Sequence, residues 1–380
     1  MSEWKEIRLG DLIEVKYGKD HKKLGNGTIP VYGSGGVMRT GDLSLYDQPS
    51  VLIPRKGTLS NIFYVDTPFW TVDTMFWTKI NTDRVLPKFL YYSIKDYKWD
   101  SLNVGSAVPS LTVPVIEGVS INIPSLETQK KIAAQLSEID DKIAVNRRIC
   151  ENLEAQAQAL FKHWFVDFAP FKDGKFVESE LGLIPEGWRV GTLTEIAEYL
   201  NGLAMQKFPP LSDDDSIPVL KIKELGQSQC DNSSDKCSKQ IKPEYIVKNG
   251  VVVFSWSGTL MVDIWCGGIC GLNQHLFKVT SDNYPKWFYL MWTKHHLAEF
   301  IRIAKDKAVT MGHIKRGDLE KAQVAIPDSN TLDKMSEVMN VIFDQIINSR
   351  LESNALSTLR DTLLPRLMSG ELKINEFTNL

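Results

Sequence analysis

The fold is decided by residues 132–164, which read IAAQLSEIDDKIAVNRRICENLEAQAQALFKHW. Apolar or small side chains recur here at alternating spacings of four and three positions, the heptad pattern of helices that pack side by side. The pattern runs from Ile132 through Asn146 to Trp164. Such a helix of about 35 residues is far longer than an ordinary core helix. The segment therefore predicts a long helix whose seam packs against a partner.

A second long helix is expected from about Thr331 onwards, where apolar residues again gather on one face. Ser125 is a candidate N-cap of the first helix and Pro170 its expected end, whereas Pro365 lies near the end of the second. We predict that the two helices pair within one chain; the alternative is pairing between two molecules. The predicted interface consists of Ile132, Leu136, Ile139, Ile143, Asn146, Leu153, Leu160, Met335, Met339, Ile342 and Ile346.

The chain also contains an internal repeat. Matching residues keep their order along the chain, at offsets that grow from 184 to 203 because the second copy carries insertions. The matched pairs include Trp4 and Trp188, Leu9 and Leu193, Gly18 and Gly202, Gly57 and Gly258, Ile123 and Ile326, Asn146 and Asn348, and Arg148 and Arg350. One structural unit is therefore used twice.

Each copy combines a mixed α/β domain with a long helix, which gives an α+β chain. Four segments are expected: a first domain over 1–124, a first helix over 125–169, a second domain over 170–327 and a second helix over 328–380. Residues 51–53 and 250–254 have the composition of strands, and residues 88–94 and 286–293 that of short amphipathic helices.

Composition excludes several classes of protein. The 380 residues include 43% hydrophobic side chains and ten tryptophans, so a disordered chain is excluded. The sequence predicts no transmembrane helix and no signal peptide, so a cytoplasmic location is expected. Five cysteines at loose spacings favour reduced thiols over a disulfide framework, with a zinc site as the weaker alternative. The net charge is −3, and the acidic excess lies mainly in residues 328–380, so any DNA-binding surface must be a local cluster.

Motifs for catalysis are missing from the sequence. It has no G-x-x-x-x-G-K-[ST] phosphate loop, no Asn-Pro-Pro-Tyr element and no H-E-x-x-H metal pair. Residues 33–36 (GSGG) lack the context of a dinucleotide fingerprint and are expected to form a turn. Asp140 and Asp141 lie inside the heptad helix, where a solvated helix face is the simpler interpretation than a nuclease site. No catalytic residue and no metal ligand is therefore predicted.

Loops flanked by glycine carry the cationic, short polar and aromatic side chains that a nucleic-acid contact would require. Phosphates are bound by Lys, Arg or backbone N–H groups, and base edges by Arg, short polar side chains or aromatic rings. The predicted contacts are Lys22, Lys23, Arg39, Arg55, Lys56, Thr58 and Ser106 in the first domain, and Lys221, Lys223, Trp256, Ser257, Thr259, Lys305, Lys307, Thr310, His313 and Lys315 in the second.

Three segments resemble the specificity subunits of type I restriction–modification systems. They are residues 160–168 (LFKHWFVDF), residues 182–188 (GLIPEGW) and residues 359–370 (LRDTLLPRLMSG). The Ile-Pro pair before each long helix also fits this family, although the residues that follow it at 328 depart from the usual pattern. The resemblance covers essentially the whole chain.

The resemblance implies an architecture and a set of partners. Two target-recognition domains, each reading half of a split asymmetric site in double-stranded DNA, would be separated by two antiparallel coiled-coil helices. The helices would dock methyltransferase subunits, and a restriction and translocation subunit would complete the complex. The chain itself would hold no cofactor, since S-adenosylmethionine, ATP and Mg²⁺ would be bound by the partner subunits, and it would contact no membrane.

Other functions remain open at the level of sequence. The nearest alternative is a specificity subunit of a related modification system with a different division of labour. A coiled-coil scaffold without a DNA role and a nuclease with an unrecognised metal site belong to other classes. DNA binding and metal-dependent nicking by the pure chain are the measurements that distinguish them.

Overall fold

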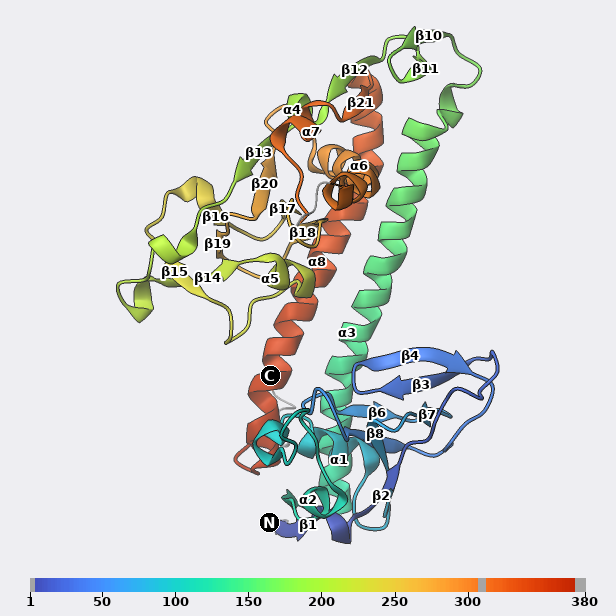
Figure 1. Ribbon diagram of the computed structural model, residues 1–380, viewed down its shortest axis with the longest axis vertical. Helices are drawn as coiled ribbons and strands as arrows, with labels where there is room; N and C mark the ends of the chain where they lie inside the picture. Colours follow the sequence, from blue (N-terminus) through green and yellow to red (C-terminus); the bar gives the residue numbers. More distant parts are fainter. Residues whose placement is uncertain (1–3, 307–311, 373–380) are drawn as a thin grey trace. The chain divides into compact units, whose positions relative to one another are not determined.

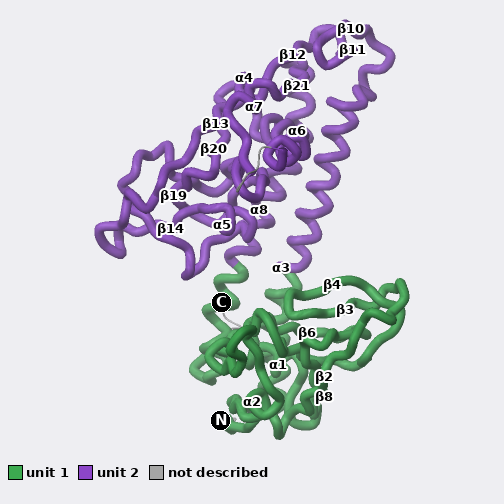
Figure 2. Tube along the Cα trace, in the orientation of Figure 1, with its two compact units in different colours: residues 1–142, 356–380 green, residues 143–355 purple. Residues whose placement is uncertain are grey.

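The computed structural model describes residues 4–306 and 312–372, and Figure 1 labels its helices and strands. The chain forms two compact units (Figure 2). Unit 1 contains residues 1–142 and 356–380, and unit 2 contains residues 143–355. Two long helices, α3 (Leu126–Phe161) and α8 (Ser329–Met368), each contribute to both units. In the part of the chain that is described, no helix has the length and apolar character needed to cross a membrane.

Unit 1 is built around a four-stranded sheet of order β2-β8-β5-β6, beside a three-stranded sheet of order β4-β3-β7 and the pair β1-β9. Its strands and helices are β1 (Lys5–Arg8), β2 (Ile13–Tyr17), β3 (Ile29–Gly33), β4 (Gly36–Gly41), β5 (Ser50–Pro54), β6 (Phe63–Val65), β7 (Trp70–Thr71), β8 (Met75–Ile80), α1 (Pro87–Ile94), α2 (Val113–Glu117) and β9 (Ser120–Ile123). The predicted strand at 51–53 and helix at 88–94 are confirmed.

Unit 2 repeats this plan with a sheet of order β13-β20-β17-β18, a second sheet of order β15-β14-β19-β16 and the pair β12-β21, and it adds the hairpin β10-β11. Its elements are β10 (Phe176–Ser179), β11 (Gly182–Pro185), β12 (Arg189–Thr192), α4 (Leu193–Ile196), β13 (Glu198–Asn201), β14 (Ser216–Leu220), α5 (Ile222–Gln227), β15 (Lys236–Ser238), β16 (Ile246–Val247), β17 (Val251–Ser255), β18 (Met261–Trp265), β19 (Cys270–Leu272), β20 (Leu276–Thr280), α6 (Lys286–Asp306), α7 (Arg316–Glu320) and β21 (Gln323–Ile326).

Strand register confirms the internal repeat. Tyr17 of β2 pairs with Phe76 of β8, and Asn201 of β13 pairs with Phe277 of β20. The offsets between these pairs are 184 and 201, the values that the sequence repeat predicts. The parallel pairings β3–β7 and β14–β19 correspond in the same way. Unit 1 and unit 2 are therefore two versions of one mixed α/β domain.

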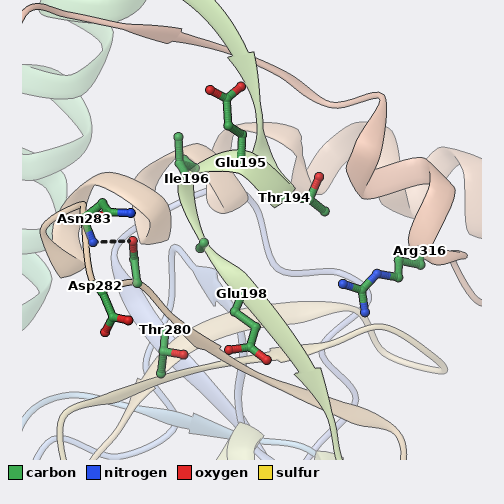
Figure 3. Close-up of a pocket in the computed structure, with 10 residues that line it drawn as sticks. Thr194, Glu195, Ile196, Glu198, Thr280, Asp282, Asn283 and Arg316 are labelled. Carbon is green, nitrogen blue, oxygen red and sulfur yellow. Dashed lines mark hydrogen bonds between the residues drawn. The ribbon is translucent and has the colours of Figure 1, made fainter.

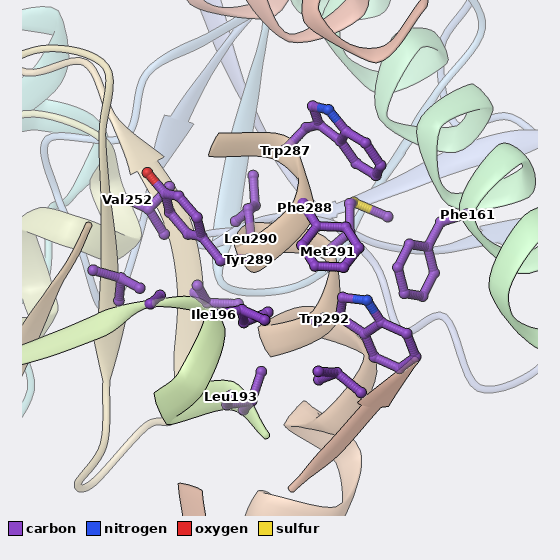
Figure 4. Close-up of a cluster of buried hydrophobic side chains, with 14 of the residues drawn as sticks. Phe161, Leu193, Ile196, Val252, Trp287, Phe288, Tyr289, Leu290, Met291 and Trp292 are labelled. Carbon is purple, nitrogen blue, oxygen red and sulfur yellow. The ribbon is translucent and has the colours of Figure 1, made fainter. Parts of the chain in front are cut away.

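Aromatic side chains fill the core of unit 2 (Figure 4). Trp287, Phe288, Met291 and Trp292 project from one side of α6 and are buried, and Phe161 of α3 packs edge-on against Trp292 with ring centroids 5.1 Å apart. α6 extends to Asp306, well beyond the helix expected at 286–293. Its second half still buries Phe300 and Ala304. The Lys-His-His segment before them interrupts the apolar spacing, so the sequence does not reveal that the helix continues.

The long helices run antiparallel where they pack. In unit 1, the Arg360 guanidinium donates a hydrogen bond to the Asp140 carboxylate over 2.6 Å. In unit 2, the Asn146 amide donates to the Glu352 carboxylate over 2.7 Å, and the Cys150 thiol lies 3.7 Å from the Ile346 carbonyl oxygen. Residue numbers rise along α3 as those of their partners fall along α8, which is the signature of an antiparallel pair within one chain.

The predicted seam faces inward. Among its α3 members Ile132, Leu136 and Asn146 are buried and the others are half-buried, and on α8 all four predicted members are buried. Asn146 is 1% exposed, so its hydrogen bond to Glu352 satisfies an amide that would otherwise be buried without a partner. A polar residue at such a position favours one register of the two helices at some cost in stability.

The beginning of α3 follows the sequence expectation and its end does not. The Ser125 hydroxyl accepts a hydrogen bond from the Thr128 backbone N–H over 3.3 Å, as expected of an N-cap. Regular α-helix ends at Phe161, before the expected stop at Pro170, and continues as a π-helical turn over Lys162–Val166. The wider turn directs Phe165 into the core beside Trp188, and Phe168 then adopts a left-handed conformation with φ of 46°.

Tyr92 ties the sheet domain of unit 1 to α3. Its hydroxyl donates a 2.7 Å hydrogen bond to the Asp140 carboxylate, and burial together with that carboxylate raises the pKa of Tyr92. We expect Tyr92→Phe to lower the free energy of unfolding of unit 1 by about 1–3 kcal/mol, because a hydrogen bond to a charged group is lost inside the fold. Denaturant unfolding monitored by circular dichroism measures this.

Tyr91→Phe is the matched control for Tyr92→Phe. Tyr91 is the neighbouring tyrosine on α1 and is half-buried, and the structure gives its hydroxyl no hydrogen-bond partner among the described residues. We expect the Tyr91 variant to unfold close to the wild type. Equal losses in both variants would show that the Tyr92 contact to Asp140 contributes nothing specific.

Candidate nucleic-acid interface

Four loops of unit 1 meet at the ends of β2 and β5. The Gly18 N–H donates to the Met75 carbonyl over 3.0 Å, and the Arg55 N–H donates to the Thr74 carbonyl over 2.8 Å. The Gly57 N–H donates to the Pro109 carbonyl over 3.0 Å, which brings the loop before α2 to the same place. We call residues 17–19, 55–58, 72–75 and 103–111 the loop framework of unit 1.

Unit 2 repeats this backbone network. The Gly202 N–H donates to the Leu276 carbonyl over 3.0 Å, and the Trp256 N–H donates to the His275 carbonyl over 3.4 Å. The Gly258 N–H donates to the Gly312 carbonyl over 3.0 Å. Residues 201–203, 256–259, 273–276 and 312–314 therefore form the loop framework of unit 2, at the offsets of the sequence repeat.

Two glycines explain why the repeat keeps its motif at these loops. A Cβ atom on Gly18 would lie 2.0 Å from the Val72 carbonyl oxygen, and a Cβ on Gly202 would lie 2.2 Å from that of Asn273. No side chain fits such a close approach of two backbones. The frameworks are thus fixed by backbone contacts, which leaves the side chains at the strand ends free to differ between the units.

Arg55 is held by two contacts at the loop framework of unit 1. Its guanidinium lies over the Tyr17 ring, 5.4 Å from the centroid, and one nitrogen donates to the Asp73 carbonyl over 3.1 Å. Lys56 and Thr58, on the same loop, are exposed. The structure therefore brings Arg55, Lys56 and Thr58 together beside the unpredicted Tyr17.

The other predicted residues of unit 1 lie away from this cluster or are otherwise engaged. The Arg39 guanidinium donates hydrogen bonds of 3.0 Å to the carbonyls of Thr40, Leu24 and Gly25, so it joins β4 to the loop before β3. The side chains of Lys22 and Lys23 are exposed on the loop before β3. Ser106 is exposed on the loop before α2, and its contact with DNA stays a prediction.

Trp256 is the centre of the corresponding cluster in unit 2. Its indole N–H donates a 2.9 Å hydrogen bond to the Asn201 amide oxygen, and its ring centroid lies 6.0 Å from that of His275 and 6.2 Å from that of His313. Thr259 is exposed on the same loop, but Ser257 is only 2% exposed and its hydroxyl shares a 3.0 Å hydrogen bond with His275 Nδ1. Ser257 is therefore placed as a support of the cluster and not at its surface.

The predicted contact lysines of unit 2 differ in their surroundings: some pair with acidic side chains and others are exposed. The Lys221 ammonium pairs with Asp235, and that of Lys223 pairs with Asp231 at 3.2 Å, so acidic side chains of one loop offset the positive charge of both. Lys305 and Lys315 are exposed at the end of α6 and just before α7. Lys307 and Thr310 lie outside the described residues. The DNA contacts of all these residues stay predictions.

Three residues of the frameworks escaped the sequence interpretation: Tyr17, Asn201 and His275. Tyr17 and Asn201 immediately precede the repeated glycines, Gly18 and Gly202, and this is the signal that could have identified them. His275 faces Trp256 only because β20 lies beside β17, a pairing that residue spacing does not reveal.

A surface pocket of unit 2 offers a different chemistry (Figure 3). It is lined by Glu195, Glu198, Asp282 and Arg316, together with small polar side chains. Three carboxylates against one guanidinium disfavour a phosphate ligand. Among the described residues, no group of three His, Cys, Asp or Glu side chains is arranged to hold a metal ion.

All five cysteines are free thiols. Cys230 and Cys270 lie close together, with sulfur atoms 3.4 Å apart, and the hydrogen bond between them lowers the pKa of Cys230 and raises that of Cys270. Burial raises the pKa of Cys237 to about 11, which keeps that thiol protonated and suits a small apolar core group.

Comparisons with known proteins identify the family. The model of the type I restriction modification DNA specificity domain matches residues 1–155 and 185–356. The MjaIX type I restriction enzyme specificity subunit of Methanocaldococcus jannaschii is 30% identical over 350 residues, covering 88% of this chain and 80% of that protein. The HindI specificity subunit of Haemophilus influenzae is 22% identical, covering 82% and 81%.

A solved structure has the same fold. The type I restriction-modification system S subunit from M. genitalium superposes with a TM-score of 0.59 at 14% identity, over 97% of this chain and 96% of that one. This likeness shows that the two α/β domains and two long helices are a shared architecture, as the sequence predicted. Together with the matching domain model and the relatives, it establishes that the chain belongs to the family of type I restriction–modification DNA specificity subunits.

Proposed function

We propose that this chain is the sequence-reading subunit of a type I restriction–modification complex. Each unit reads one half of a split site in double-stranded DNA through its loop framework. The helix pair α3–α8 is the docking surface for methyltransferase subunits, and a restriction and translocation subunit completes the assembly.

The repeat of the loop framework is the observation that carries this proposal. Two copies of one backbone network lie in a single chain, and each presents aromatic and polar side chains at the ends of neighbouring strands. Aromatic, amide and guanidinium groups are those that contact base edges. Because the two sets of side chains differ, they suit an asymmetric site.

The proposal assigns all chemistry to the partner subunits. The sequence lacks phosphate-loop and methyltransferase motifs, and S-adenosylmethionine, ATP and Mg²⁺ are therefore expected on those partners. The chain itself positions the DNA, and it thereby determines which base of which site reaches the methyltransferase subunit.

Reconstitution tests the proposal. The pure chain should show no methyl transfer, ATP hydrolysis or DNA cleavage, and addition of a methyltransferase subunit should produce methylation at one split motif. Radiolabelled methyl transfer followed by sequencing of the modified sites measures both. Turnover of S-adenosylmethionine by the pure chain, or methylation with the partner that does not depend on sequence, would refute the proposal.

A further inference from the structure

The two loop frameworks present different side chains at equivalent positions. Tyr17 and Asn201 occupy the same place at the ends of β2 and β13, as their pairing with Phe76 and Phe277 shows. Arg55 and Trp256 also correspond. The Arg55 N–H donates to Thr74, the residue before β8, and the Trp256 N–H donates to His275, the residue before β20. Their carbonyls also correspond: Arg55 accepts from Leu111 and Trp256 accepts from Ile314.

In each unit these two side chains contact one another. The Arg55 guanidinium lies 5.4 Å from the Tyr17 ring centroid, and the Trp256 indole N–H donates to the Asn201 amide over 2.9 Å. The backbone network sets the two strand ends side by side, so a change of one side chain alters the pair and leaves the framework unchanged. Such a construction permits different base preferences on one scaffold.

The pair of unit 1 suits a G·C base pair. Arginine binds guanine through two parallel hydrogen bonds to O6 and N7, which is the commonest specific contact in the major groove. The Asp73 carbonyl holds one nitrogen of Arg55 and the Tyr17 ring supports its face, so the guanidinium is oriented in advance. Nη2 has no partner among the described residues. Arg39, the other predicted arginine of unit 1, is occupied by three carbonyls.

The pair of unit 2 suits an A·T base pair. Asparagine pairs with the N6 and N7 edge of adenine, and apolar surfaces contact the methyl group of thymine. Asn201 is exposed at the strand end, and the Trp256 indole beside it is a half-buried apolar surface. The Asn201 oxygen accepts from Trp256 and its nitrogen donates to the Gly202 carbonyl over 3.3 Å, which leaves one oxygen lone pair and one N–H for the adenine edge. No cation lies in this pair, since the arginine of unit 1 is replaced by tryptophan.

We propose that Tyr17–Arg55 and Asn201–Trp256 are the equivalent base-reading pairs of the two units, the first for a G·C and the second for an A·T base pair. This inference rests on the proposed function. It assigns one position of each half-site to a named pair of side chains.

The test compares variants of the full chain, reconstituted with a methyltransferase subunit, by selecting binding sites from a pool of randomised duplexes. Arg55→Ala should lower the preference for one G·C pair by about 5- to 150-fold in one half-site only. Trp256→Ala should relax one A·T position in the other half-site. Arg55→Gln keeps a polar side chain but loses the guanidinium, so it should lose the preference for the G·C pair at the same position.

Lys56→Ala is the matched control for Arg55→Ala. Lys56 is the next residue along the chain, and its side chain is exposed. Its charge can bind a DNA phosphate, but it does not occupy the framework position of Arg55. We expect this variant to weaken binding to all sequences alike and to reduce the salt dependence, without a change in the selected bases.

The outcomes separate this inference from the proposed function. A wild-type complex that selects no split site would refute the proposed function. A wild type that selects a site, with Arg55→Ala and Arg55→Gln selecting the same bases, would refute the base-reading pair alone. Relaxed preference in both half-sites, or uniform weakening without a change of bases, would also refute it. If Arg55→Ala unfolds in a thermal scan, Arg55→Gln decides.

Discussion

Replacement of Arg350 by alanine is expected to destabilise unit 2 by about 2–4 kcal/mol. The Arg350 guanidinium binds Glu154 of α3 at 2.7 Å, Asp263 of β18 at 3.0 Å and the Ile264 carbonyl at 3.0 Å. It therefore joins both long helices of unit 2 to its sheet. Loss of one partner from a buried ion pair costs about 3–5 kcal/mol, and we take a lower range because the carboxylates keep some contact with water.

The pKa of Arg350 agrees with this role. Burial acts to lower the pKa of the guanidinium, but the attraction of Asp263 and Glu154 outweighs it and raises the pKa. The side chain is 18% exposed, so the protein stabilises its charge more than water does. Without it, two carboxylates would remain half-buried and near one another.

Unfolding in denaturant, monitored by tryptophan fluorescence, measures the effect. Arg148→Ala is the matched control, because Arg148 is the repeat equivalent of Arg350 but is exposed on α3. That variant should unfold like the wild type. Adding Asp263→Asn to Arg350→Ala should recover part of the loss, since one uncompensated carboxylate is removed. An unchanged midpoint for Arg350→Ala would show that the ion pairs contribute nothing.

A second large effect is expected from lengthening both long helices. Seven residues added after Lys142 and seven after Ala355 keep the heptad phase, and both insertions fall where the chain passes between its two units. The two points also lie opposite one another in the antiparallel pair, between the Asp140–Arg360 and Asn146–Glu352 contacts. The insertions add about 10 Å of helix, or roughly three base pairs of B-DNA.

We expect the unspecified spacer of the selected DNA site to grow by about three base pairs, with the bases of both half-sites unchanged. The proposed function predicts this, because the insertions touch neither loop framework. Affinity should fall, since three base pairs rotate one half-site by about 100° unless the DNA twists or bends. Site selection with wild-type and lengthened chains measures the spacer. A spacer of constant length, or altered bases, would contradict the proposed role of the helices.

The helices and the repeat were predictable because their signals are periodic. The heptad seam from Ile132 to Trp164 and the repeated glycines at 18 and 202 stand in the sequence itself. The strand at 51–53 has the composition of a buried strand and was found for that reason. Local patterns of this kind can be recognised in the sequence because the side chains that form them face one hydrophobic core.

Contacts that depend on how the chain folds back on itself were not predictable. The ion pairs of Lys221 and Lys223 with Asp235 and Asp231 depend on how one loop folds back, and Arg39 is bound by carbonyls of the loop before β3. Tyr17 and Asn201 carry no motif of their own, and their neighbours come from other strands. The π-helical turn after Phe161 likewise accompanies the packing of Phe165 against Trp188, and no helix-ending residue in the sequence marks it.

Unit 1 is assembled from both ends of the chain, and this has a consequence during translation. Leu363, Leu364 and Leu367 of α8 complete the core that Ile132 and Leu136 of α3 begin. A ribosome adds about 5–20 residues per second, so the apolar seam of unit 1 stays without its partner for on the order of ten to fifty seconds while residues 143–367 are made. During that interval the growing chain carries an exposed apolar stripe that other nascent chains or chaperones can bind. A transcript truncated within α8 would leave this stripe uncovered permanently.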